Sequence, residues 1–180
     1  FSPSDAELRK QGVAEWKEWL AKEGATAELT YPVSDGDPLL GRTLICYYAQ
    51  SKVVEYDENN KERSSKQVQG VWGGQGLPNG HRLLALYGMR RVVEFDENWN
   101  EVWSLEKEQL PGSPYNVQRL PNGNTLVSCS DAQKVLEFDR NKKLIWELPA
   151  QGRPMDAVRL ENGNTLVALQ QGARVAEFSP

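Results

Sequence analysis

The sequence predicts an all-β protein made of β-propeller blades, with about four repeats of roughly forty residues and four strands each, and one amphipathic helix in front. Three observations support this prediction. A glycine-containing string recurs along the chain, a second string follows each copy of it, and short apolar runs lie between them. Short strands at even spacing, separated by turn signals, are typical of a repetitive all-β fold.

The first recurring string reads Arg-Leu-Pro-Asn-Gly-Asn-Thr-Leu-Val at 119–127 and returns as Arg-Leu-Glu-Asn-Gly-Asn-Thr-Leu-Val at 159–167. An earlier copy lies at 77–84, and 41–45 keeps only the second half. The second string is a basic residue, an apolar pair, a glutamate and an aromatic residue, at 52–57, 91–96, 134–139 and 174–178. Two copies continue to Trp103 and Trp146, which we expect to wedge between adjacent blades.

In the third repeat the predicted strands are 115–120, 125–129, 135–138 and 144–148. Asn122-Gly123 predicts a type I′ hairpin turn between the first two strands, because both residues tolerate positive φ. Apolar and polar residues do not alternate cleanly in the second and third strands. This pattern favours sheets that are covered on both faces, as blades packed face to face would be.

A helix is expected at residues 5–23, with a capping box at 4–7 and Gly24 as its stop. Val13, Trp16 and Leu20 share one face of that helix, with Trp19 beside it. We expect this face to pack on the side of the blades or on a helical domain outside the sequence. The predicted domains are therefore 1–25 for the helix and 26–180 for the repeats.

Composition argues against several classes of function. The net charge of −4 argues against nucleic-acid binding, and no apolar run is long enough to span a membrane. His81 is the one histidine, so most histidine-dependent catalysis is disfavoured. Cys46 and Cys129 fit no metal or redox spacing and are expected to be small buried apolar residues. We expect no catalytic residues, no metal site and no cofactor.

The strings Leu-Pro-Asn-Gly-Asn-Thr-Leu and Val-x-Glu-Phe-Asp-x-Asn resemble bacterial propeller repeats of the PQQ-like and arylsulfotransferase-like kind. The chain as a whole is similar to propeller tails that follow HEAT repeats, where a tryptophan-rich helix like that at 15–19 precedes the first blade. Arylsulfotransferase-like blades often carry a channel-facing histidine at the start of the first strand. Here the matching positions hold Trp72, Tyr115 and Met155, so the resemblance does not imply that chemistry.

The predicted function is a non-catalytic binding or assembly module for a protein or peptide partner. Its binding face should be the one formed by the connections from second to third strand and from fourth to first, where we expect the lengths to vary. The candidate binding residues are Trp72, Tyr87, Arg90, Tyr115, Asn116, Asp131, Arg153, Met155 and Asp156.

Two finer hypotheses concern charges. A basic residue precedes the third strand of every repeat (Lys52, Arg91, Lys134 and Arg174) and could form an anion-binding rim, or could pair with acids of its own blade. Asn116 and Asp156 occupy equivalent positions, and their oxygens could hold calcium. The alternative function is therefore a calcium-dependent, lactonase-like hydrolase with a site in the central channel.

The first repeat lacks a clear first strand, since 32–40 is rich in turn residues, and the last repeat lacks a fourth strand. Incomplete blades expose sheet edges that can pair with another chain. The sequence therefore predicts self-association, with two copies forming a ring of seven or eight blades, and 26–31 could supply one missing strand. A four-bladed monomer and an excerpt of a longer or engineered chain are the alternatives.

Overall fold

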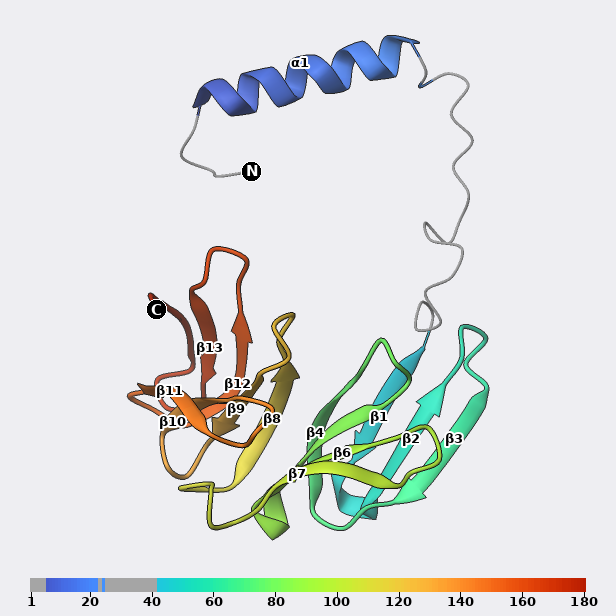
Figure 1. Cartoon of the computed structure of the whole chain (residues 1–180), viewed down its shortest axis with the longest axis vertical. Coiled ribbons are helices and arrows are strands. Elements are labelled where there is room, and N and C mark those ends of the chain that lie inside the picture. Colours follow the sequence, from blue (N-terminus) through green and yellow to red (C-terminus); the bar gives the residue numbers. More distant parts are fainter. Residues whose placement is uncertain (1–5, 23, 25–41) are drawn as a thin grey trace. The chain divides into compact units, whose positions relative to one another are not determined.

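The structure is a computed structural model that describes residues 6–22, 24 and 42–180. The chain divides into two compact units, Phe1–Gly36 and Asp37–Pro180. The first contains one helix and the second contains four antiparallel sheets (Figure 1). The predicted all-β fold with one N-terminal helix is confirmed.

Helix α1 covers Ala6–Lys22, within a residue of the prediction at each end. Val13, Trp16 and Trp19 are exposed on it, and the two indole rings lie 6.2 Å apart. The proposed capping box and the side chain of Leu20 lie outside the described residues, and the expected docking of this helix stays a prediction. No helix in the described ranges is both long and apolar enough to cross a membrane.

The strands follow the repeats. The first sheet holds β1 (Thr43–Tyr47), β2 (Lys52–Tyr56) and β3 (Glu62–Gln67); the second holds β4 (Val71–Gly76), β5 (Arg82–Leu86), β6 (Arg91–Phe95) and β7 (Glu101–Leu105); the third holds β8 (Pro114–Arg119), β9 (Thr125–Cys129), β10 (Lys134–Phe138) and β11 (Leu144–Pro149); the fourth holds β12 (Pro154–Arg159), β13 (Thr165–Leu169) and β14 (Arg174–Phe178). Among residues 42–180, the first and fourth sheets have three strands each and the others have four. The segments 26–31 and 32–40, discussed above as strand and turn, lie outside the described residues.

The turns between the first two strands of a repeat differ from the prediction. In the third repeat Gly123 has φ +88° and donates its N–H to Leu120 O at 2.9 Å, whereas Asn122 is not in the positive-φ region. The loop is thus three residues long, a type I turn followed by a left-handed glycine, and the predicted type I′ turn is wrong. The fourth repeat makes the same turn, with Gly163 at φ +86° and its N–H donated to Leu160 O at 3.0 Å, although Glu161 stands in place of Pro121.

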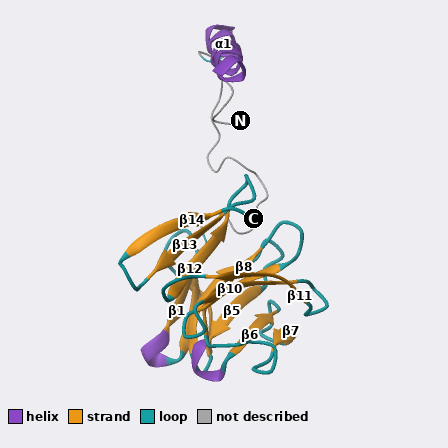
Figure 2. Cartoon of the chain, turned by 90° about the vertical axis from the view of Figure 1, so that its left-hand side faces the viewer, coloured by secondary structure: helices purple, strands orange, loops and turns teal. Residues whose placement is uncertain are grey.

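The connections from second to third strand also differ from the prediction. All four have the same length (48–51, 87–90, 130–133 and 170–173), and each ends in a residue with positive φ. Two of them form the 3₁₀ turns Tyr48–Gln50 and Tyr87–Met89, which lie at the same edge of the blades (Figure 2). Only the connections into the next blade vary, at 68–70, 106–113 and 150–153.

Three apolar clusters fill the spaces between neighbouring sheets. Val53 and Leu84 belong to the cluster between the first and second sheets, Leu83 and Val127 to the next, and Leu126 and Val167 to the last. Each internal sheet therefore contributes residues to both sides, which explains the weak alternation in its sequence. Trp103 is buried in the middle cluster and Trp146 packs against the last one, so both tryptophans lie between blades as predicted.

A glutamate, an arginine and a tryptophan join each pair of neighbouring blades. In the third junction Arg159 Nη2 lies 2.9 Å from Glu137 Oε2, and its guanidinium stacks 4.5 Å from the Trp146 ring. In the second, Arg119 makes the same contacts with Glu94 at 2.6 Å and Trp103 at 4.9 Å. Glutamate and tryptophan come from one blade and arginine from the next.

The first junction builds the same trio from other positions. Gly76 stands where the later repeats have Arg119 and Arg159, and Arg82, at the start of β5, reaches Glu55 Oε2 at 2.8 Å instead. Ser64 of β3 pairs with Glu55, as Trp103 pairs with Glu94. The missing indole is supplied by Trp99 of the next blade, which stacks on Arg82 at 4.6 Å and donates its Nε1–H to Ser64 Oγ.

Candidate functional site

The inner strand of each of the last three sheets begins with a β-bulge. In β8 the register runs from Pro114–Cys129 to Asn116–Ser128, which leaves Tyr115 as the extra residue. The same shift leaves Trp72 as the extra residue of β4 and Met155 as that of β12. A bulge turns the side chain of its extra residue away from the regular pleat. All three of these residues line one shared groove.

The groove has a volume of about 410 Å³ and is lined by the inner strands of the blades. Leu44, Ile45 and Cys46 of β1 form one side, where the first sheet has no further inner strand in the described residues. The remaining lining residues come from the starts of β4, β8 and β12: Trp72, Gly73, Gly74, Tyr115, Asn116, Met155 and Asp156. The site therefore draws on all four blades.

An aromatic cluster forms one end of the groove. The ring of Trp72 lies 4.4 Å from that of Tyr48, 5.6 Å from Tyr87 and 4.7 Å from Tyr115, and the last two tyrosines meet edge to face at 4.9 Å. Such tilted and edge-on contacts are the favourable geometries for aromatic pairs. Burial raises the pKa of the Tyr115 phenol, and nearby Tyr87 adds to this shift, so the hydroxyl is a neutral donor at physiological pH.

A repeated contact holds these rings in place. The first residue after the second strand of one blade touches the bulge residue of the next: Tyr48 meets Trp72, Tyr87 meets Tyr115, and Ser130 Oγ lies 3.9 Å from Met155 Sδ. The aromatic cluster is thus a set of blade-to-blade contacts as well as a surface.

Asn116 and Asp156 form the polar end of the groove. Asn116 Nδ2 donates to Asp156 Oδ1 at 2.7 Å, and the same oxygen accepts the Ala157 N–H at 2.8 Å. Asn116 Oδ1 is buried without a hydrogen-bond partner and lies against Gly73, where an added Cβ would come within 2.8 Å of it. The lining residues include one carboxylate, that of Asp156, and no basic side chain.

The structure brings five of the nine predicted binding residues into the groove lining: Trp72, Tyr115, Asn116, Met155 and Asp156. Tyr87 joins them through its ring contacts. Arg90 and Asp131 instead hold the connection at 106–113, since Arg90 Nη2 donates to Leu110 O at 2.7 Å and Asp131 Oδ1 accepts from Ser113 N at 2.6 Å. Arg153 is exposed.

Sequence reasoning missed Tyr48, which is half exposed and closest to Trp72, and the apolar side formed by β1. Aligning the repeats could have found Tyr48, because it follows β1 as Tyr87 follows β5. The small residues Gly73 and Gly74 were also missed. They take the place of Asn116 and Val117, and neither has room for a side chain, because an added Cβ would lie 2.6 Å from Tyr115 O at Gly73 and 2.6 Å from Leu84 Cδ2 at Gly74.

The four basic residues before the third strands make contacts within their own blades. Lys52 pairs with Glu62 at 3.7 Å, Lys134 with Glu147 at 2.7 Å, and Arg91 with both Glu101 and Glu106, while Arg174 donates to a backbone carbonyl. The acids that pair with Lys52, Lys134 and Arg91 lie on the fourth strand of the repeat or directly after it. The recurring glutamates Glu55, Glu94 and Glu137 instead bind the arginines between blades. The anion-binding rim stays a prediction.

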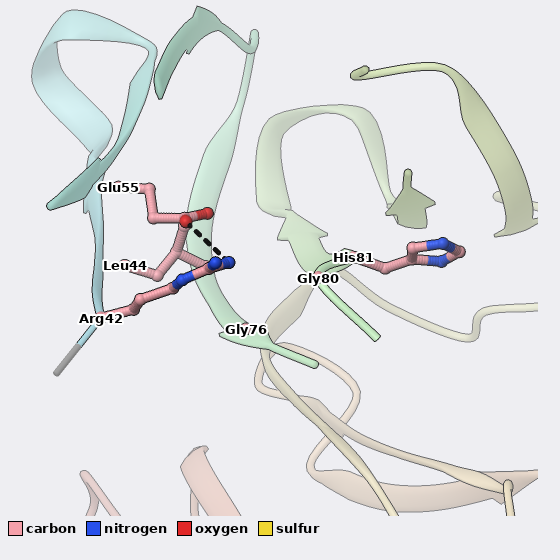
Figure 3. A pocket seen from close by; sticks show the side chains of 6 residues that line it. All are labelled: Arg42, Leu44, Glu55, Gly76, Gly80 and His81. Atoms are coloured by element: carbon pink, nitrogen blue, oxygen red, sulfur yellow. Dashed lines mark hydrogen bonds and ion pairs between the residues drawn. The ribbon is translucent and has the colours of Figure 1, made fainter. Parts of the chain in front are cut away.

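A second, smaller pocket of about 190 Å³ lies beside the first junction, lined by Arg42, Leu44, Glu55, Gly76, Gly80 and His81. Figure 3 shows Arg42 and Glu55 facing each other, with Gly76 opposite and the His81 ring pointing away. A Cβ at Gly76 would meet nothing within 4 Å, because the space filled elsewhere by Arg119 or Arg159 is vacant here. His81 Nδ1 lies 2.8 Å from Glu94 Oε1 and belongs to the next junction.

Neither the cysteines nor the acids form a reactive or metal-binding cluster among residues 42–180. Both cysteines are free, and burial raises the pKa of the Cys46 thiol to about 11 and that of Cys129 to about 12. They are therefore protonated and unreactive at neutral pH. No three of the described His, Cys, Asp and Glu residues lie together as a metal site would need.

No known protein family matches the sequence, and no curated protein matches it. Solved structures do. A protein of unknown function from Bacteroides caccae is 19% identical with a TM-score of 0.57, covering 83% of this chain and 63% of that one. A streptogramin B lyase is 12% identical with a TM-score of 0.63, covering 78% and 51%.

A chain of the mitotic checkpoint complex is 7% identical with a TM-score of 0.63, covering 78% of this chain and 46% of that one. This chain thus spans about half to two thirds of the length of these three structures. The similar structures are β-propeller-type proteins, so the four sheets are β-propeller blades. At such low identity the similarity establishes the fold alone.

Proposed function

We propose that this protein is a non-catalytic propeller module that binds a protein or peptide partner in the groove at its inner strands. The observation that carries the proposal is the set of three bulges that aim Trp72, Tyr115 and Met155 into one groove. Tryptophan and tyrosine are the residues most enriched at binding hot spots. The groove lining also lacks a nucleophile paired with a base, as nucleophilic catalysis would need.

The groove lining favours a ligand that combines an apolar or aromatic group with a positive charge. Trp72 and Tyr115 offer aromatic rings to which a cation is attracted, and Asp156 supplies the one negative charge. Only one oxygen of that carboxylate is engaged by Asn116 and Ala157. A peptide segment with an aromatic residue next to arginine or lysine meets both requirements.

Selection from a random peptide library tests this proposal. We expect peptides with aromatic and basic residues to be enriched, and Trp72→Ala to weaken their binding by about tenfold or more, as loss of a hot-spot residue does. Asp156→Asn should weaken the binding of basic peptides and leave the binding of neutral peptides unchanged. Val102→Ala, at an exposed site on β7, is the matched control. Enrichment of acidic peptides, or equal binding by Trp72→Ala, would contradict the proposal.

The alternative, a calcium-dependent lactonase-like hydrolase, is favoured by the contact between Asn116 and Asp156. In the present arrangement Asp156 Oδ1 already accepts two hydrogen bonds, which leaves few oxygens for a cation that takes six to eight. Calcium titration followed by calorimetry separates the two functions. Heat of binding that is lost in Asp156→Asn, together with lactone hydrolysis that a chelator abolishes, would support the enzyme.

Two finer proposals accompany the main one. We infer from the repeat strings that the blades belong with the PQQ-like and arylsulfotransferase-like kind, including tails that follow HEAT repeats. We also propose that the module associates with itself to close its ring. A chain in the mitotic checkpoint complex shares the fold, which makes a role in an assembly reasonable by analogy.

A further inference from the structure

The last sheet has an apolar surface on the side away from the third sheet, which we call the end face. It is formed by Val158, Leu166, Val175 and Glu177, because these residues alternate with Ala157, Val167 and Ala176, which pack on the third sheet. Val175 is 64% exposed, Val158 39% and Leu166 36%.

The same positions are buried in the internal blades. Leu166 corresponds to Leu126 and Leu83, and Val175 corresponds to Val135 and Val92, all of which are at most 1% exposed. Those four side chains are covered by the next blade along the chain. The end face is therefore one half of the junction that occurs three times within this protein, with no sheet of the described residues against it.

The glutamate on the end face also lacks the arginine that its counterparts bind. Glu55, Glu94 and Glu137 each bind an arginine from the following blade. Glu177, at the equivalent position, has contacts from Asn164 Nδ2 at 2.6 Å and Asn162 Nδ2 at 3.4 Å, both within its own blade. No ion pair among residues 42–180 reaches it. A partner that fits the end face should therefore bring hydrogen-bond donors to this carboxylate.

The opposite half of a junction lies on the first sheet. Its surface away from the second sheet, which we call the first face, carries Thr43, Ile45, Tyr47 and Tyr56. These residues correspond to Arg82, Leu84, Leu86 and Phe95, and Leu84 and Phe95 pack against the first sheet in the first junction. Ile45 is 36% exposed where Leu84 is fully buried.

The first face is suited to a partner with a carboxylate. Tyr47 and Tyr56 reach across it with their hydroxyls 3.3 Å apart, in place of the apolar Leu86 and Phe95. Thr43 pairs with Tyr56 as Arg82 pairs with Phe95, and Arg82 is the residue that reaches the glutamate of the preceding blade. In a junction of the same geometry, the hydroxyls of Thr43 and Tyr56 would face Glu177.

We propose that the end face binds the first face of a second copy of this chain, with Glu177 of one copy opposite Thr43 and Tyr56 of the other. The contact joins two different surfaces, so it leaves one free face on each copy, and two such contacts close a ring of two copies if the rotation allows. This proposal rests on the self-association proposed above and names its surfaces. It does not depend on which ligand the groove binds, although Ile45 both lines the groove and belongs to the first face.

Absolute mass by light scattering, over a dilution series, tests the contact. We expect the wild-type protein to reach twice 20.3 kDa. Val175→Asp and Leu166→Asp place a charge in the interface and should return the mass to that of one copy. Both side chains are exposed in the single copy, so folding should be unaffected. Val102→Asp, at a site 49% exposed on β7, is the control and should leave the mass unchanged.

A gain-of-function variant keeps the test decisive if association is weak. Thr43→Arg copies Arg82 and should pair with Glu177 of the other copy, tightening association by on the order of tenfold. Adding Glu177→Gln should remove that gain. A mass that persists in both aspartate variants would overturn the named surfaces while leaving self-association intact. A single-copy mass that Thr43→Arg does not change would overturn both. Peptide binding measured on Val175→Asp tests the groove separately.

Discussion

At the residue scale, the junctions show how one packing requirement can be met by different positions. Glu94 is 2% exposed and binds Arg119, Arg140 and His81. Burial alone would raise the pKa of this carboxyl, but the hydrogen bonds from Arg140 and His81 and the nearby guanidinium charges hold it below its usual value. Burial also lowers the pKa of Arg119 to about 10, which still leaves it charged at neutral pH. The Glu94 carboxylate is thus kept ionised by the cationic groups around it.

In the first junction the arginine lies at position 82, whereas the later repeats place it at the position of Gly76. This difference leads to a testable prediction. Arg82→Thr should reduce the free energy of unfolding by about 3 kcal/mol, because it leaves the buried Glu55 with only Arg42 at 3.5 Å. Adding Gly76→Arg should restore most of this loss, because the pair then matches Arg119 and Thr125 of the third repeat. Urea unfolding measures both variants.

Gly76→Ala combined with Arg82→Thr is the control for that restoration. It adds a side chain at the same open position, where a Cβ meets nothing within 4 Å, but brings no charge. We expect it to be as unstable as Arg82→Thr alone. Equal recovery by alanine would mean that the guanidinium has no part in the effect.

At the element scale, turns and bulges decide where side chains point. The turns between third and fourth strands place Asn60, Trp99 and Lys142 in the left-handed region, with φ of 60°, 64° and 68°. An aspartate before each turn accepts backbone N–H groups, as Asp139 Oδ1 does from Lys143 N at 2.9 Å. For a residue such as Lys142 this left-handed backbone conformation is a cost that glycine avoids and asparagine tolerates better.

Lys142→Gly should therefore stabilise the protein by about 0.5 kcal/mol, the difference between the relieved backbone and the added chain entropy. Gly123→Ala, which puts a side chain at φ +88°, should destabilise it by about 1 kcal/mol. Thermal unfolding compares the two.

Trp99→Gly gives the contrasting case. Its backbone has the same left-handed conformation, but the change removes the ring that stacks on Arg82 and binds Ser64, so we expect a net loss of stability. A stabilised Trp99→Gly would show that the indole contributes less than the backbone costs.

At the scale of the whole molecule, stability should follow the number of neighbours a sheet has. The second and third sheets have a blade on each side, and the fourth has one on one side among residues 42–180. Each blade alone cannot bury both its faces, so repeats of this kind are stabilised by their contacts with one another.

Hydrogen exchange on the dilute protein should show this gradient. We expect the amides of β14 to exchange on the order of tenfold faster than those of β10, because β10 is paired on both sides and β14 on one. At high protein concentration the difference should shrink if a second copy covers the end face. Uniform exchange across the two sheets would contradict the gradient.

Much of the fold could be predicted from the sequence. The repeat spacing, the Asn-Gly turns and the apolar runs are local patterns, so they indicated four blades, the strand order and most strand limits, including Thr125–Cys129. The same repeats pointed to Trp72, Tyr115 and Met155 as residues of a binding face, because positions that differ between otherwise equal blades stand out.

What only the tertiary structure decided depends on contacts between residues distant in the chain. The bulges that aim those three side chains are offsets in pairing between strands, and no single strand encodes them. Arg90 and Asp131 have the chemistry of binding residues, yet they hold a loop, because the chain brings Leu110 and Ser113 to them. Likewise the shift from Arg119 to Arg82 requires two blades to be face to face, because an arginine's role depends on which carboxylate it can reach.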